Sequence, residues 1–283
     1  MNCHDIQRLS SERQNSNCHW RCNRARLCNG KKFGILGAKV AIISRNPDNL
    51  KAAKEKLGGN GIDCEYSVCN IKNPEEISKS ISEVLSVFGS FNVLVNNAAG
   101  NFVSPSENLT SKGIDTILDI VLKGTIYFST QAGKYWIENR IKASILSIAA
   151  TYAWTGSGYV MPSAAAKAGV LAMTRSLAAE WGPLGIRSVA IAPGPFPTKG
   201  AWDRLVMDAR YEEMLKKRNP SRRFGNVDEI SDLASYLISD SADYINGEVV
   251  TIDGGEWLNA GGEFNILGNL TPEEMSIFSK RVK

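Results

Sequence analysis

Short apolar segments alternate with longer segments of helical periodicity along most of this chain. The apolar runs are typical of buried parallel strands, and the segments between them repeat their apolar residues every three to four positions. This alternation predicts an α/β fold, a Rossmann-like doubly wound parallel sheet covered by helices on both faces. The expected strands are Val40–Ile43, Glu65–Val68, Val93–Asn97, Ser144–Ile148, Ser188–Ala192 and Glu248–Asp253. The expected helices are Asn49–Leu57, Pro74–Phe88, Ser111–Asn139 with an interruption near Gly124, Ser163–Trp181 and Asn226–Ser239.

Residues 1–30 show neither periodicity. They contain four of the 6 cysteines and both of the 2 histidines: Cys3, Cys18, Cys22, Cys28, His4 and His19. The spacing lacks a pair of Cys-x-x-Cys knuckles, so we expect no metal site here. Order is expected to begin at Lys31, in the tail of a helix that ends at Gly37. The chain therefore divides into an atypical segment over residues 1–30, non-native or disordered, and a single Rossmann-like domain over residues 31–283.

The composition excludes two classes of partner. The net charge is +4, which suits an anionic cofactor but does not indicate a nucleic-acid-binding protein. No apolar run approaches the ~20 residues that cross a bilayer, so we expect no membrane partner. The C-terminal Arg281-Val282-Lys283 is not the Ser-Lys-Leu peroxisomal signal.

Candidate site residues follow the predicted strands. Ligands of such sheets bind at the carboxyl ends of the strands, and the motifs of this chain lie there. Ser163 and Lys167 are four apart, so a hydroxyl and an ammonium share one helix face. They fit either a ribose-binding pair or a helix-start serine beside a solvated lysine. Pro193-Gly194-Pro195 follows another strand, where two prolines fix the backbone and the glycine permits close approach.

These features, in this order, resemble the short-chain dehydrogenase/reductase family. Its usual Tyr-x-x-x-Lys motif has Ser163 in place of the tyrosine. Ala150 stands where the family has a catalytic serine, and Val121 where it has a proton-relay asparagine. The resemblance thus implies that ordinary alcohol dehydrogenase chemistry is absent. The same replacements, from about Gly37 onward, resemble the mitochondrial-type 2,4-dienoyl-CoA reductases. The segments that carry this resemblance are Asn96–Phe102, Tyr152-Ala153, Thr155–Gly158, Pro162–Lys167, Pro193–Pro195 and Gly262–Asn265.

The resemblance implies a role for each site residue. Reduction of a dienoyl thioester places negative charge on the thioester oxygen, which Asn101 and Tyr152 would stabilise as hydrogen-bond donors. Tyr152 would then protonate the α-carbon, since a phenol ordinarily holds its proton at neutral pH. Ser163 and Lys167 complete the implied catalytic set. The implied substrate-binding residues are Phe102, Thr110, Lys72 and Arg204, with Lys72 and Arg204 either at the CoA phosphates or solvated. Trp202 packs either on the acyl chain or on its own helix.

The implied cofactor is NADPH. Arg45 follows a strand at the place where NAD-binding members carry an acidic residue, and a guanidinium there suits a 2′-phosphate. A solvated surface arginine is the alternative. Asn70 stands where the family has aspartate. The other implied cofactor-binding residues are Asn97, Ala98, Lys167, Pro193, Gly194, Pro195 and Phe196. The resemblance further implies a homotetramer packed through the long helices, and a mitochondrial location, with a cytoplasmic one as the alternative.

One required feature is missing. A dinucleotide-binding fold needs glycines in its first βα turn, where backbone N–H groups hold the pyrophosphate. Gly30 and Gly34 stand alone in residues 1–36. We therefore keep a second hypothesis, a catalytically impaired member that serves as a folded subunit or binding protein. The sequence also suggests that residues from about Ser11 to Gly30 are translated in the wrong frame. A one-base shift allows Asn17–Gly30 to read Thr-Val-Thr-Gly-Gly-Ala-Thr-Gly-Leu-Gly-Tyr-Ala-Met-Ala, which is the missing loop.

Overall fold

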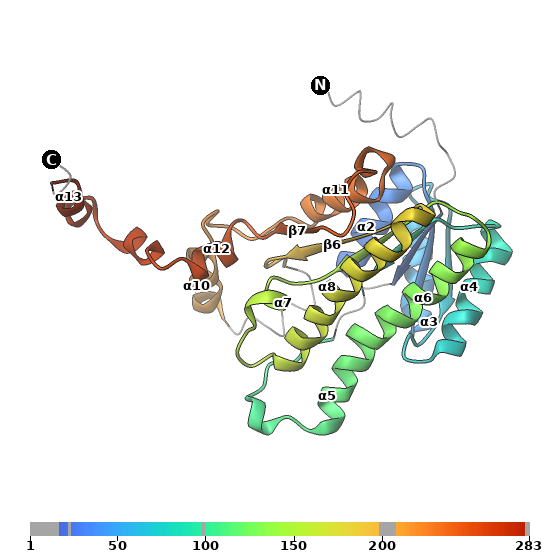
Figure 1. Cartoon of the computed structure of the whole chain (residues 1–283), viewed down its shortest axis with the longest axis horizontal. Coiled ribbons are helices and arrows are strands. Elements are labelled where there is room, and N and C mark those ends of the chain that lie inside the picture. Colours follow the sequence, from blue (N-terminus) through green and yellow to red (C-terminus); the bar gives the residue numbers. More distant parts are fainter. Residues whose placement is uncertain (1–16, 22–23, 98–99, 198–207, 281–283) are drawn as a thin grey trace.

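The computed structural model describes residues 17–21, 24–97, 100–197 and 208–280, with side chains from Asn29 to Phe278 within these ranges. Its sheet has strand order β3-β2-β1-β4-β5-β6-β7, and every neighbouring pair is parallel. The predicted doubly wound α/β fold is therefore confirmed (Figure 1). The strands are β1 (Asn17–Arg21), β2 (Lys39–Ser44), β3 (Cys64–Val68), β4 (Val93–Asn96), β5 (Ala143–Ile148), β6 (Ile186–Pro193) and β7 (Val249–Ile252).

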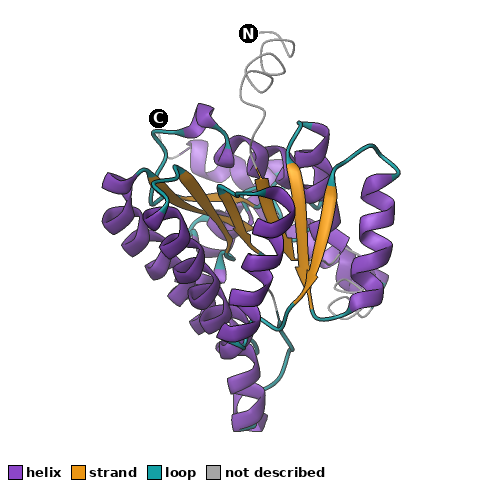
Figure 2. Ribbon diagram, turned by 90° about the vertical axis from the view of Figure 1, so that its right-hand side faces the viewer, coloured by secondary structure: helices purple, strands orange, loops and turns teal. Residues whose placement is uncertain are grey.

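Helices cover both faces of the sheet, as Figure 2 shows. One face packs against α2, α3 and α11, through Phe33, Leu50, Leu57 and Leu237 among others. The other packs against α4, α6 and α8, through Ile77, Phe128, Trp136 and Trp181. The helices are α2 (Arg24–Ile35), α3 (Pro47–Gly58), α4 (Pro74–Phe88), α5 (Ser111–Leu118), α6 (Gly124–Glu138), α7 (Tyr152–Thr155), α8 (Met161–Trp181), α10 (Ala209–Arg218), α11 (Val227–Ile238), α12 (Glu256–Gly261) and α13 (Pro272–Lys280).

Local sequence explains where the helices begin. Asn46 and Asn73 cap α3 and α4 with side-chain oxygens, and a proline follows each of them in the first helical turn. Burial then holds the helices in place. Trp136 is fully buried, and its indole N–H donates to the Phe91 carbonyl at 2.8 Å. Fully burying an aliphatic or aromatic side chain stabilises a fold by about 1.5–3 kcal/mol, so these contacts outweigh weak helix propensity.

Strand β1 lies in the middle of the sheet, within the segment that the sequence sets apart. It pairs with β2 and β4, and α2 begins at Arg24 rather than near Lys31, where order was expected. Main-chain pairing explains why β1 forms without an apolar pattern, because ladder hydrogen bonds use N–H and C=O groups that every non-proline residue carries. That residues 1–30 are non-native stays a prediction.

Among the described residues, no helix is long and apolar enough to cross a membrane. The sequence also did not predict α7, α10, α12 and α13. These are short helices after β5, β6 and β7, and their apolar residues are too few to show a period. The final segment, from Phe264 through η5 (Asn265–Asn269) to α13, extends away from the sheet in Figure 1 and exposes Phe264 and Ile266.

Candidate active site

The parallel sheet brings the predicted site residues to one edge. Arg45, Asn70 and Asn97 follow the carboxyl ends of β2, β3 and β4 in that order. Tyr152 comes shortly after β5, and Gly194 directly after β6. Because all these strands run in the same direction, their carboxyl ends meet at the crevice where open α/β sheets bind ligands.

The Ser163 and Lys167 pair is buried at the start of α8. Ser163 is 2% exposed and Lys167 is 6% exposed, so the solvated-lysine alternative is wrong. The Lys167 ammonium donates to the carbonyl of Ile148, the last residue of β5. Burying an ammonium is costly unless it is hydrogen-bonded, and this carbonyl partly meets that cost. The result is a fixed positive charge at the edge where an anionic cofactor would enter.

Tyr152 reaches Ser163 from a separate helix. The two oxygens, Tyr152 Oη and Ser163 Oγ, are 3.1 Å apart, so a hydrogen bond joins α7 to α8. The phenol of Tyr152 thus lies next to Ser163, the position at which the family usually has its tyrosine. Sequence spacing could not give this contact, because it depends on how the short helix α7 folds back onto α8.

The positions of the family's other catalytic groups are apolar here. Ala150 is 7% exposed and Val121 is 1% exposed, so neither offers a hydroxyl or an amide to a substrate. Val121 lies in a π-helical turn, Asp119–Lys123, that joins α5 to α6. The predicted interruption near Gly124 is this turn. Such turns are rare in helices and occur frequently at functional sites.

The predicted substrate-side residues form a rim beside α5. Asn101 and Phe102 are exposed, and the Phe102 ring lies against Gly113, where an added Cβ would come within 3.2 Å of it. The hydroxyl of Thr110 accepts from the Gly113 N–H at 3.1 Å and caps α5. Both side chains are therefore tied to the first turn of the same helix.

Lys72 is held by an ion pair. Its ammonium lies 3.0 Å from Asp119, whose other oxygen lies 2.9 Å from Lys123. Hydrogen bonds from Lys123 and then Lys72 lower the pKa of Asp119. The cluster combines two cations with one carboxylate, so it keeps a positive charge at the rim. Ala98, Trp202 and Arg204, also named as candidates, lie outside the described residues.

On the cofactor side, Arg45 is exposed directly after β2. Asn70 is only half-buried, and its main-chain N–H donates to Glu76 at 2.8 Å. Its side-chain oxygen accepts from the Lys72 N–H at 3.3 Å. Asn97 is likewise half-buried.

The segment Pro193–Phe196, which we call the nicotinamide-side loop, is tightly supported. Gly194 donates to the Ile252 carbonyl at 2.9 Å, and a Cβ at Gly194 would lie 2.7 Å from that of Asp253. The Pro195 carbonyl accepts from the Gly225 N–H at 3.1 Å. Only glycine allows this close approach of two chain segments.

Two features of the site were not found from the sequence. Trp154 and Trp257 make an edge-to-face contact with ring centroids 5.5 Å apart, which links α7 to α12. The segment 219–226 also packs beneath the nicotinamide-side loop. The sequence signals were present, as a tryptophan two residues after Tyr152 and as the capping motif Asn226-x-x-Glu229, but neither pattern says what it contacts.

Within the described side chains, no three Cys, His, Asp or Glu residues gather where they could hold a metal ion. A family model described as enoyl-(acyl carrier protein) reductase matches residues 30–256. A crystal structure of a short chain dehydrogenase from Bacillus anthracis is 38% identical, with a TM-score of 0.79 over 86% of this chain and 97% of that one. The chain belongs to the short-chain dehydrogenase/reductase family.

Curated relatives within this reductase family are similar over most of the chain. A probable 2,4-dienoyl-CoA reductase, (2E)-enoyl-CoA-producing, from Bacillus subtilis is 41% identical over 81% of this chain and 91% of its own. A probable 2,4-dienoyl-CoA reductase 3, (3E)-enoyl-CoA-producing, from Caenorhabditis elegans is 42% identical over 79% of this chain and 74% of its own. The names of these two relatives give different products, so the product that this chain forms is worth measuring.

Proposed function

We propose that this chain is an NADPH-dependent 2,4-dienoyl-CoA reductase that forms 3-enoyl-CoA in the β-oxidation of unsaturated fatty acids. The hydrogen-bonded pair of Tyr152 and Ser163, 3.1 Å apart, carries the proposal. It places a phenol at Ser163, one turn of α8 before Lys167, while the usual serine and asparagine positions are filled by buried Ala150 and Val121. The names of the curated relatives support the same activity.

The residues support the following chemistry. In a chain that binds NADPH, the cofactor would supply the hydride for the distal carbon of the conjugated system. Asn101 and Tyr152 donate hydrogen bonds to the thioester oxygen, on which negative charge develops. A donor already in place at such an oxygen is worth about 3–4 kcal/mol of transition-state stabilisation. Tyr152 then gives its proton to the α-carbon, and water restores the phenol.

Binding is assigned by the charge at the edge of the sheet. Arg45 holds the 2′-phosphate, and Lys167 holds the nicotinamide ribose with Ser163 beside it. Asn70, Asn97 and Ala98 line the rest of the cofactor path, and the nicotinamide-side loop lies along the ring. Lys72 and Arg204 meet the CoA phosphates, while Phe102 and Thr110 face the acyl chain.

Two further proposals concern the environment of the enzyme. We keep the homotetramer packed through the long helices, which a measured solution mass will test. We also keep the mitochondrial location. A relative from Danio rerio, 33% identical, is named peroxisomal, and another relative comes from a bacterium, which has no such organelle. Imaging of a tagged chain is therefore the direct test of its location.

The phosphate side does not fit the cofactor in the chain as written. Residues Asn17–Asn29 contain no glycine, although the first βα turn of the sheet lies within them. The family match begins at residue 30, where the atypical segment ends. Both observations support the hypothesis that Ser11–Gly30 come from a shifted reading frame. Sequencing the transcript tests it, and an uninterrupted frame through these codons would contradict it.

The position of the new proton tests the activity itself. The chain whose residues 17–30 are replaced by the frame-shifted sequence is incubated with NADPH and a 2,4-dienoyl-CoA in deuterated water. We expect NADPH oxidation, a 3-enoyl product and deuterium at carbon 2, since Tyr152 exchanges its proton with solvent. A 2-enoyl product with deuterium at carbon 4 would show that the proton lands elsewhere. Tight NADPH binding without oxidation would exclude the proposed substrate.

A further inference from the structure

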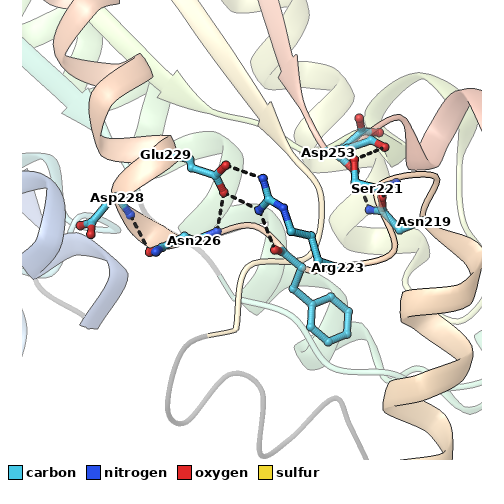
Figure 3. A network of polar contacts seen from close by, with 9 residues as sticks. Asn219, Ser221, Arg223, Asn226, Asp228, Glu229 and Asp253 are labelled. Carbon is cyan, nitrogen blue, oxygen red and sulfur yellow. Dashed lines mark hydrogen bonds and ion pairs between the residues drawn. The ribbon is translucent and has the colours of Figure 1, made fainter. Parts of the chain in front are cut away.

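The segment 219–226, which we call the bridging loop, connects the end of β7 to the start of α11 through two groups of polar contacts (Figure 3). In the first, the side chain of Asn219, which is 2% exposed, donates to the Asp253 carbonyl at 2.7 Å. Ser221 donates its hydroxyl to the Gly254 carbonyl at 3.0 Å. These contacts attach one end of the bridging loop to the turn after β7.

The second group attaches the other end to α11. Arg223 donates to both carboxylate oxygens of Glu229, at 2.8 and 2.6 Å. Arg223 also donates to the Phe224 carbonyl at 3.0 Å, and Glu229 accepts from the Asn226 N–H at 2.7 Å. Hydrogen bonds from Arg223 and from the Asn226 backbone lower the pKa of Glu229 to about 2. The carboxylate is thus ionised at neutral pH. It holds the main chain at Asn226 directly and at Phe224 through Arg223, so both neighbours of Gly225 are fixed.

Gly225 transmits this order to the proposed site. Its N–H donates to the Pro195 carbonyl at 3.1 Å. A Cβ at Gly225 would lie 2.2 Å from Cε1 of the Phe196 ring, so the ring rests directly on the Gly225 backbone. A movement of residues 223–226 would therefore move the nicotinamide-side loop.

We propose that Arg223 and Glu229 are positioning residues, which hold the nicotinamide-side loop at the height that a bound nicotinamide needs. The inference rests on the proposed function only for the identity of that ligand. The side chains of Arg223 and Glu229 are 59% and 42% exposed. Exposed ion pairs contribute little to global stability. Their effect is therefore local, and that separates a positioning role from a merely structural one.

Hydrogen exchange of the full chain tests the inference without any cofactor. E229Q removes the charge that binds Arg223, and we expect the Gly225 N–H to exchange about tenfold faster. D232N is the matched control, because Asp232 lies on the same helix and forms an exposed ion pair with Lys32 at 2.5 Å. D232N should leave Gly225 protected, while both variants melt within about 2 °C of the parent. Equal exchange in E229Q and D232N would overturn the inference.

The second test is a cofactor titration of the chain whose residues 17–30 are replaced by the frame-shifted sequence, which we call the loop-restored chain. We expect E229Q and R223A each to weaken NADPH binding about tenfold, and the double variant no further, because the two residues act as one unit. R223K should not restore binding, since an ammonium cannot bind both carboxylate oxygens. Additive losses, or unchanged binding in E229Q, would contradict the inference. NADPH binding is measured without acyl-CoA, so failure of the proposed substrate leaves this result intact.

Discussion

Two interior strands of the same sheet, β1 and β6, show how differently a strand and a site depend on sequence. β6 is buried from Ile186 to Ala192, and its residues there are apolar apart from Arg187 and Ser188. β1, which is also an interior strand, has the sequence Asn-Cys-His-Trp-Arg. Buried parallel strands are normally near-continuous apolar runs, a pattern that the sequence of β6 follows and the sequence of β1 does not.

The comparison shows that main-chain pairing can hold a strand in the sheet even when the turn after that strand lacks the glycines that bind a pyrophosphate. The edge of the sheet after β5 and β6 carries buried Lys167 and the hydrogen bond between Tyr152 and Ser163. It also carries the nicotinamide-side loop, which main-chain hydrogen bonds hold in place. The turn after β1 has no glycines to bring N–H groups onto a pyrophosphate. The catalytic half and the phosphate half of the proposed cofactor site therefore differ in completeness, and three changes test this difference.

The largest effect is expected from restoring the first βα unit. Replacing residues 17–30 with the frame-shifted sequence supplies several N–H donors to the pyrophosphate. Each hydrogen bond to a charged group contributes about 1.5–3 kcal/mol, so NADPH should bind at least a hundredfold more tightly. Calorimetric titration of both chains measures the difference. Tight binding by the chain as written would remove the contrast between β1 and β6.

The next effect tests the complete half. Tyr152→Phe removes the phenol but keeps the ring, and should lower kcat of the loop-restored chain by about 10²–10⁴-fold, the usual contribution of a general acid. NADPH affinity should stay the same. Ser163→Ala is the informative partner, because it keeps the phenol and removes only its 3.1 Å contact. Normal turnover in Tyr152→Phe, with Ser163→Ala inactive, would reverse the assignment.

A smaller effect is expected at the far end of the cofactor. Arg45→Asp replaces a cation for the 2′-phosphate with an acceptor for ribose hydroxyls, so preference should shift from NADPH toward NADH. The ratio of the two kcat/KM values measures the shift, and kcat with saturating NADH should change little. An unchanged ratio would mean that Arg45, although exposed after β2, points away from the adenosine.

The sequence predicted strands β2 to β7 and most of the helices that pack on the sheet, because these segments carry an apolar period or helix caps. The helix Pro74–Phe88 has the expected bounds, since Asn73 and the proline mark its start and Gly89 marks its end. The sequence did not predict contacts between distant turns. That Tyr152 reaches Ser163, or that Gly225 lies under Phe196, depends on the path of irregular segments after β5 and β6. The resemblance named the site residues, but their support had to be seen in three dimensions.

The glycines around the nicotinamide-side loop also bear on how freely this part of the chain can vary. Added methyl groups at Gly194, Gly225 and Gly254 would come within 2.7, 2.2 and 2.6 Å of neighbouring atoms. Atoms at such distances overlap, so even alanine must displace its surroundings. Saturation mutagenesis should therefore find these positions as intolerant as buried leucines, although none of the three is buried. Variation in this region is limited by the space between closely packed chain segments rather than by burial from solvent.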